Sequence, residues 1–174
     1  MGCCRYNCFS AEIWFLWAVN DSREEFLDTI PDDVDLSLVP FLRTLSFIIA
    51  IAPSFYNRYR AYLPFHWLLR LLKTAQHGNC IEEISILIDP NRRPQDFTPS
   101  ESDIFPWEEF GPLLTENFPR LRKIQISLQT DDFTSGALPL LWEATKPDDP
   151  WAKKFTATGL LQIKEVSGEY QLLL

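Results

Sequence analysis

One short pattern of apolar residues recurs along this chain at nearly equal intervals. Its apolar positions lie three residues apart and then two residues apart, with polar residues between them. The copies are Leu42-Arg-Thr-Leu45-Ser-Phe47, Ile81-Glu-Glu-Ile84-Ser-Ile86, Leu121-Arg-Lys-Ile124-Gln-Ile126 and the weaker Thr158-Gly-Leu-Leu161-Gln-Ile163. Their spacing of about 37 to 40 residues is typical of repeat proteins, in which each unit buries its apolar face against the next unit.

Helical segments are predicted between the copies of this pattern. Residues 65–75 and 106–116 carry apolar residues at helical spacing, and residues 150–158 begin at Pro150, which follows Asp149 as an N-cap and suits the first position of a helix. Gly111-Pro112 is expected to kink or shorten the second helix. Strands joined by crossovers of this length run parallel. We therefore predict helices on one side of a parallel sheet, with strands at 42–49, 81–88, 121–128 and 161–166.

Two other architectures share a repeat length of about 40 residues. A propeller blade needs four strands in each unit, whereas each unit here holds one β-rich segment. An all-helical array is disfavoured by the Ile-x-Ile runs, because β-branched residues favour strands. An α/β fold is therefore preferred. The residues expected to form one buried row across its strands are Leu45, Ile84, Ile124 and Leu161.

The first 35 residues do not carry a clear copy of the pattern. The sequence Ser22–Glu25 matches a capping box, which predicts a short helix over residues 23–30. We therefore divide the chain into an N-terminal helical or partial-repeat segment, residues 1–35, and a repeat domain, residues 36–174.

The start of the chain leaves its secondary structure open. Ile13–Val19 contains no polar residue that would reveal a period, so both helix and strand are compatible with it. If the repeat extends backward from Leu42 by one more unit of the same length as the next, then Cys3, Tyr6 and Cys8 occupy the apolar positions. The N-terminus would then be the remnant of an earlier unit.

Charge and cysteine content argue against several classes of function. The formal net charge of −8 disfavours nucleic-acid binding, which requires a basic face. Three of the four cysteines crowd into the first eight residues, and no zinc-ligand spacing or disulfide framework is present. We expect an intracellular protein, cytoplasmic or nuclear, without a bound metal. Membrane contact is expected only if Gly2, Cys3 or Cys4 is lipidated, and Tyr6 stands where the myristoylation signal has Ser or Thr.

Known enzyme motifs are missing from the sequence. It contains no phosphate-binding glycine loop, no Gly-x-Ser-x-Gly elbow and no His-Glu-x-x-His motif. Acids that are adjacent in sequence, such as Glu82-Glu83, point in different directions on a strand or helix, which suits solubility better than acid–base catalysis. We therefore expect a protein without catalytic residues or cofactors. An enzyme with an unrecognised site is the less favoured alternative.

The polar residues of the repeated pattern are the candidate binding residues. On a strand they point away from the side that the apolar residues bury. The expected rows across adjacent strands are Thr44, Glu83 and Lys123, and beside them Ser46, Ser85, Gln125 and Gln162. These rows either bind a protein partner or keep the sheet soluble. An ion pair between Glu83 and Lys123 would contribute only about 0.2 to 1 kcal/mol.

The repeated pattern followed by a helical crossover resembles an irregular leucine-rich repeat with long units. More narrowly, residues 36–47, 81–86, 118–126 and 159–163 resemble the repeat region of mushroom-type fungal F-box-like proteins. The resemblance covers about residues 36 to 166, and no F-box segment precedes Leu36.

The resemblance implies a leucine-rich-repeat-like solenoid of about four irregular units of roughly 40 residues. In such families an F-box docks onto a ubiquitin-ligase scaffold while the repeat domain holds the substrate protein. We therefore expect a protein–protein interaction module that acts as a ubiquitin-ligase adaptor. The alternative is a free-standing or truncated repeat protein without that role.

Overall fold

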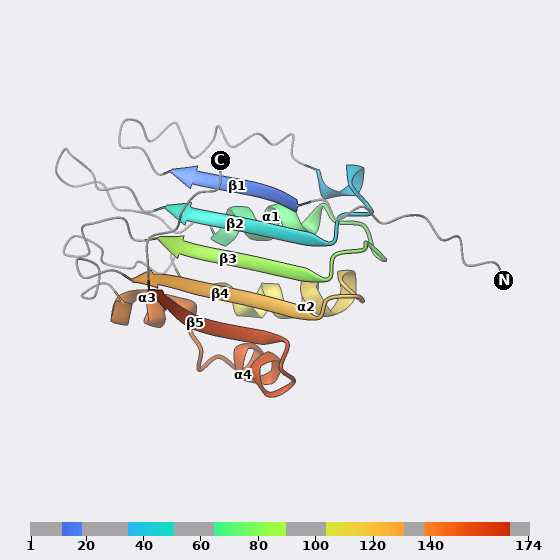
Figure 1. The fold of residues 1–174 in the computed structure, drawn as a ribbon. Helices are drawn as coiled ribbons and strands as arrows, with labels where there is room; N and C mark the ends of the chain where they lie inside the picture. The colour runs from blue at the N-terminus through green and yellow to red at the C-terminus, as the bar shows by residue number, and fades with distance from the viewer. Residues whose placement is uncertain (1–11, 19–34, 51–64, 90–103, 131–137, 168–174) are drawn as a thin grey trace.

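The computed structural model describes residues 12–18, 35–50, 65–89, 104–130 and 138–167. Five strands form one parallel sheet, and each strand lies beside the next strand in the chain (Figure 1). The strands are β1 (Glu12–Ala18), β2 (Thr44–Ala50), β3 (Glu83–Asp89), β4 (Lys123–Thr130) and β5 (Leu161–Ser167). The predicted α/β class with parallel strands is therefore confirmed.

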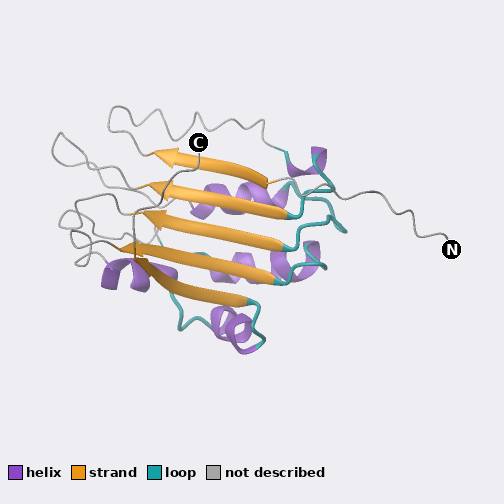
Figure 2. Cartoon of the chain, in the orientation of Figure 1, coloured by secondary structure: helices purple, strands orange, loops and turns teal. Residues whose placement is uncertain are grey.

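The helices of the described part lie between the strands in the chain. They are the 3₁₀ helix η2 (Leu36–Leu38) and the α-helices α1 (Phe65–Lys73), α2 (Trp107–Asn117), α3 (Leu138–Thr145) and α4 (Pro150–Ala157). Helices α1 and α2 cover the same face of the sheet (Figure 2). Buried residues of α3 and α4 join the same hydrophobic core. The opposite face of the sheet carries none of the α-helices of the described residues.

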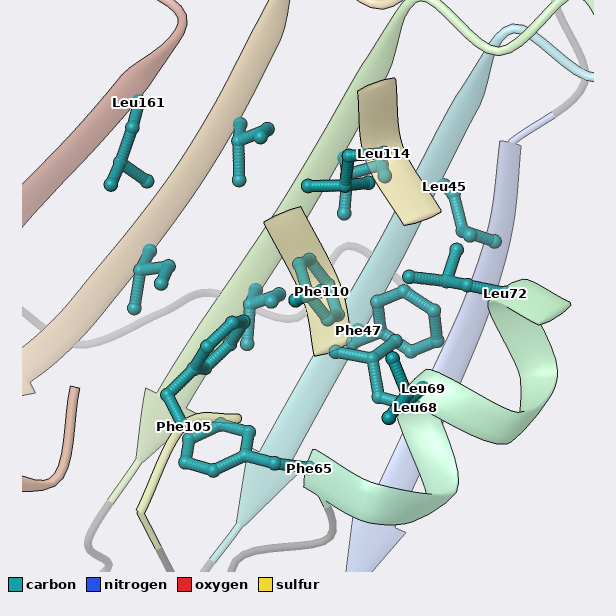
Figure 3. Packing of buried hydrophobic residues seen from close by; sticks show 14 of the residues in the cluster. Leu45, Phe47, Phe65, Leu68, Leu69, Leu72, Phe105, Phe110, Leu114 and Leu161 are labelled. Carbon is teal, nitrogen blue, oxygen red and sulfur yellow. The ribbon is translucent and has the colours of Figure 1, made fainter. Parts of the chain in front are cut away.

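The register places corresponding residues of the repeated pattern directly beside one another. Leu45 pairs with Ile84, Ile84 with Ile124, and Ile124 with Leu161. All four are at most 2% exposed, so the predicted buried row is confirmed. A second row on this side consists of Phe47, Ile86 and Ile126, and Figure 3 shows Leu45 and Phe47 against the leucines of α1.

The strands begin about two residues later than the repeated pattern. Leu42 and Ile81, its first apolar residues, are buried in the turns that lead into β2 and β3. These turns are joined by backbone hydrogen bonds: the amide of Glu82 donates to the carbonyl of Arg43, and the amide of Arg122 donates to that of Glu82, each at 2.8 Å. The same connection therefore recurs from one unit to the next.

Polar side chains also link successive units. In three hydrogen bonds that involve a side chain, the two partners stand 38 residues apart. The Leu36 amide donates to Thr74 Oγ1 at 2.8 Å, Asn79 Nδ2 donates to the Asn117 carbonyl at 2.8 Å, and Trp107 Nε1 donates to the Thr145 carbonyl at 2.7 Å. The buried Asn79 side chain also accepts from the Ile81 amide. The separation of these bonded residues along the chain thus agrees with the repeat period seen in the sequence.

Aromatic rings fill the core beneath α1 and α2. The ring of Phe105 lies 4.8 Å from Phe65, 4.4 Å from Trp107 and 4.6 Å from Phe110, measured between centroids. All four side chains are at most 1% exposed. Figure 3 shows Phe65, at the start of α1, and Phe105, just before α2, facing one another. The residues that begin two crossover helices thereby fix those helices on the sheet.

The N-terminal segment contains a strand where the sequence left helix and strand open. Ile13 of β1 pairs with Leu45, and Phe15 pairs with Phe47. The backward extension of the repeat by a unit of equal length is therefore wrong, because it puts Tyr6 rather than Ile13 beside Leu45. Cys3, Tyr6 and Cys8 lie outside the described residues, as does the helix predicted over 23–30.

The position of β1 also bears on the predicted domain division. Strand β1 belongs to the same sheet as β2 to β5. The sheet therefore crosses the division that the sequence suggests between residues 1–35 and 36–174.

Helix α2 continues through Gly111-Pro112 to Asn117, so it is not shortened there. Gly111 is needed because a Cβ atom at this position would overlap the indole ring of Trp151 on α4. Helix α4 starts as predicted, with Asp149 Oδ1 accepting from the Trp151 amide at 2.8 Å, and Gly159 follows it with a positive φ of 74°. Helix α3 contains the apolar segment Leu138–Ala144.

Candidate recognition face

The seven candidate binding residues lie on β2, β3, β4 and β5, and they are aligned across these strands as predicted. Thr44 pairs with Glu83, and Glu83 with Lys123. The adjacent row runs from Ser46 through Ser85 and Gln125 to Gln162. Each of these residues neighbours a core residue on its strand, and side chains alternate between the faces of a sheet. Both rows therefore lie on the face opposite α1 and α2, which we call the polar face.

One ion pair crosses the polar face. Lys123 Nζ lies 3.9 Å from Glu83 Oε2, and the two side chains are 40% and 49% exposed. A pair that is this long and this hydrated contributes at most about 1 kcal/mol to stability. Both charged groups thus remain accessible to a partner. They present opposite charges on neighbouring strands.

Amide and hydroxyl groups make up the second row. Gln125 Nε2 donates to Ser127 Oγ at 3.0 Å, two residues further along β4. This bond holds the Gln125 side chain along its strand. Gln162 on β5 is exposed, whereas Ser85 and Gln125 are half-buried. The row can therefore offer hydrogen bonds to an extended segment of another protein.

Ser46 differs from the expectation that the polar residues of the pattern face solvent. It is only 7% exposed, so it is not available as a contact residue in this structure. The next row on the same face is also buried, with Ile48 at 9%, Leu87 at 7% and Ser127 at 5%. On β2 to β4 the polar face thus has an accessible half at the amino-terminal ends of the strands and a buried half toward their carboxyl-terminal ends, whereas Lys164, the β5 residue of the same row, is exposed.

The predicted rows of binding residues end before this buried half, for which the sequence carries its own signal. Residues 47–51 and 86–88 are continuous apolar runs. In parallel sheets such runs indicate strands that are buried on both faces. The pattern h-x-x-h-x-h described only the first half of each strand, where polar residues alternate with apolar ones. The seven predicted binding residues all lie in that first half, and Ser46 is the one among them that the structure buries.

We expect Leu87→Ala to lower the free energy of unfolding by about 2 to 4 kcal/mol, as for other buried leucines. Leu87 lies on the face opposite α1 and α2. If that face were exposed to solvent, the substitution would leave the free energy of unfolding nearly unchanged. Urea unfolding of the variant and of Ser85→Ala, two residues earlier on the same face, measures the difference. A loss within about 0.5 kcal/mol for Leu87→Ala, the range typical of surface positions, would show that this half is exposed.

Asp35 and Cys80, which lie outside the polar face, take part in local hydrogen bonds. Asp35 caps η2, and hydrogen bonds from Ser37 lower the pKa of its carboxyl group below the usual value. The stabilisation from this cap is therefore present at neutral pH and is lost as the pH falls through the lowered pKa. Cys80 Sγ accepts from Arg120 Nη1 at 3.3 Å, which joins two units.

The described residues contain neither a cluster of metal-ligating side chains nor a helix fit to cross a membrane. No group of three or more His, Cys, Asp or Glu side chains within these ranges could hold a metal ion. None of the helices formed by these residues has the length and apolar character needed to cross a membrane.

The chain was also compared with known proteins. No protein-family model, no curated protein and no solved structure matches it.

Proposed function

We propose that this chain is a non-enzymatic module that recognises another protein through the accessible half of its polar face. The observation that carries the proposal is the register, which places Thr44, Glu83 and Lys123 side by side on three strands. The apolar side chains of these strands form the core. The polar ones are therefore free of any role in packing the helices.

The architecture we propose is a leucine-rich-repeat-like solenoid of about four irregular units. The strands follow one another in chain order, and hydrogen bonds link positions 38 residues apart. In a stacked array each unit contacts only its neighbours, and the aligned strands create an extended binding surface. Both features support this architecture for residues 36 to 166.

The resemblance to F-box-like proteins suggests what the module serves. In that version of the proposal the polar face holds a substrate protein for a ubiquitin ligase. The alternative is a free-standing adaptor. Affinity purification of the tagged chain distinguishes the two, because only the first version predicts that a ubiquitin-ligase scaffold is recovered together with the substrate. Recovery of partners without any ligase scaffold favours the second.

The experiment that tests the recognition role is a pull-down with a variant of the polar face. The variant Glu83→Lys, Lys123→Glu, Gln125→Ala reverses the ion pair and removes one amide while keeping the net charge. We expect it to lose the partners that the unaltered chain recovers, because a partner matched to one charge order meets like charges after the reversal. Circular dichroism and thermal unfolding establish that the variant is folded.

A matched control alters the helical side of the molecule. Lys73 Nζ on α1 lies 2.9 Å from Glu109 Oε2 on α2, with side chains that are 52% and 54% exposed. The control Lys73→Glu, Glu109→Lys, Thr115→Ala therefore reverses an ion pair of similar exposure and removes a hydroxyl group from the helical side. It should keep the partners. Identical partner lists from the polar-face variant and the unaltered chain would contradict the proposal.

A further inference from the structure

The edge strand β5 differs from the inner strands at two central positions. In β3 and β4 these positions hold Leu87 with Ile88 and Ser127 with Leu128, all of which are buried. In β5 the corresponding residues are Lys164, which pairs with Ser127, and Glu165, which pairs with Leu128. Both are exposed. Charged side chains therefore replace the apolar and small ones at the last strand of the described sheet.

Glu165 occupies a position that the register assigns to the core side of the sheet. Its pairing partner Leu128 and the next residue along, Ile88, are both fully buried. Earlier in β5 the same side carries Leu161, which is 2% exposed, and Ile163, which is half-buried. The apolar side of β5 is thus interrupted by a carboxylate two residues after Ile163. Adjacent residues of a strand point to opposite faces, so Lys164 cannot neutralise it.

An edge strand is a template for further pairing, because its outer backbone N–H and C=O groups are not used within the sheet. Strand β5 is last in the strand order of the described residues. A second copy of this chain could add a strand there and continue the sheet. Charged residues at inward positions are one of the ways in which proteins prevent such additions.

We propose that Lys164 and Glu165 terminate the sheet at β5 and prevent a second copy from pairing with this edge. A strand laid beside β5 would remove water from an ammonium group on one face and from a carboxylate on the other. Burying an unpaired charge is far more costly than burying an apolar side chain. This role is independent of any partner that the polar face binds.

The test replaces both charges with β-branched apolar residues. We expect Lys164→Val, Glu165→Val to associate through β5, with a weight-average mass that at least doubles as the protein concentration rises. Light scattering after size-exclusion chromatography measures the mass. Hydrogen exchange should show slower exchange of β5 amides in the associated form, because these groups gain backbone partners. The unaltered chain should show neither the rise in mass nor the slower exchange of β5 amides.

Two further variants make the test specific. Lys153 and Asp148 form an exposed ion pair of 3.2 Å at α4, so Lys153→Val, Asp148→Val adds the same apolar groups outside strand β5. It should keep the mass of the unaltered chain. Lys164→Glu, Glu165→Lys keeps a charge at each position and should do the same. The proposal is overturned if the β5 valine variant keeps the mass of the unaltered chain, or if the α4 control associates equally.

Discussion

Trp107→Ala is expected to lower the free energy of unfolding by about 3 to 5 kcal/mol, the cost of removing a buried aromatic side chain. Trp107 is 1% exposed and packs against Phe105, Phe110 and Phe155. Its Nε1 group also donates to the Thr145 carbonyl at 2.7 Å. Alanine would therefore leave a cavity and a buried carbonyl without its partner, two effects that add to each other.

Denaturant unfolding of two further variants separates these effects. Trp107→Phe keeps most of the packing and loses the hydrogen bond, so we expect a smaller loss of about 1 to 3 kcal/mol. Trp142, which is 37% exposed on α3, serves as the matched control, and Trp142→Ala should cost less than about 1 kcal/mol. Equal losses for Trp107→Ala and Trp142→Ala would contradict the placement of Trp107 in the core.

Ile124→Ala is expected to lower the free energy of unfolding by about 2 to 5 kcal/mol. Ile124 is fully buried and pairs with Ile84 on one side and Leu161 on the other. It stands in the middle of the row that the repeated pattern creates. A cavity there removes contacts with two neighbouring strands at once.

Gln162→Ala provides the comparison for Ile124→Ala. Gln162 is exposed on β5, one residue after Leu161 and on the opposite face. Its replacement should change the free energy of unfolding by no more than about 0.5 kcal/mol. If Ile124→Ala cost less than about 1 kcal/mol, below the range measured for buried isoleucines, the register of β4 would be shifted by one residue.

The repeated pattern predicted the central strands because its physics is local. Apolar residues such as Leu45, Ile84 and Ile124 alternate with polar ones, so each strand reveals which of its faces is buried. A constant period then implies that equivalent residues become neighbours. The pairing of Leu45 with Ile84 and of Ile84 with Ile124 follows directly.

Other features depend on contacts that no local pattern reveals. Ile13–Val19 has no polar residue to mark a face, and Ile13 stands closer in sequence to its partner Leu45 than the later repeats stand to one another. Neither the pattern nor its period therefore located β1. Gly111 looks like a helix breaker in isolation. Glycine is required there because Trp151 approaches from α4, two helices later in the chain.

The candidate site was predicted in part for the same reasons. The alignment of Thr44, Glu83 and Lys123 depends only on register, and the structure has it as predicted. The accessibility of each residue depends on what covers the sheet, which alternation cannot tell. Ser46 is buried for that reason, although its neighbours in the row are partly exposed.

Carboxylate labelling with a carbodiimide and an amine, with and without a partner recovered by the unaltered chain, tests the recognition role most directly. Glu83 on the polar face and Glu109 on the helical side have similar exposures, 49% and 54%. Mass spectrometry reports the labelling of each. We predict that the bound partner lowers the labelling of Glu83 and leaves that of Glu109 unchanged. Protection of Glu109 with unchanged labelling of Glu83 would contradict the assignment of the polar face.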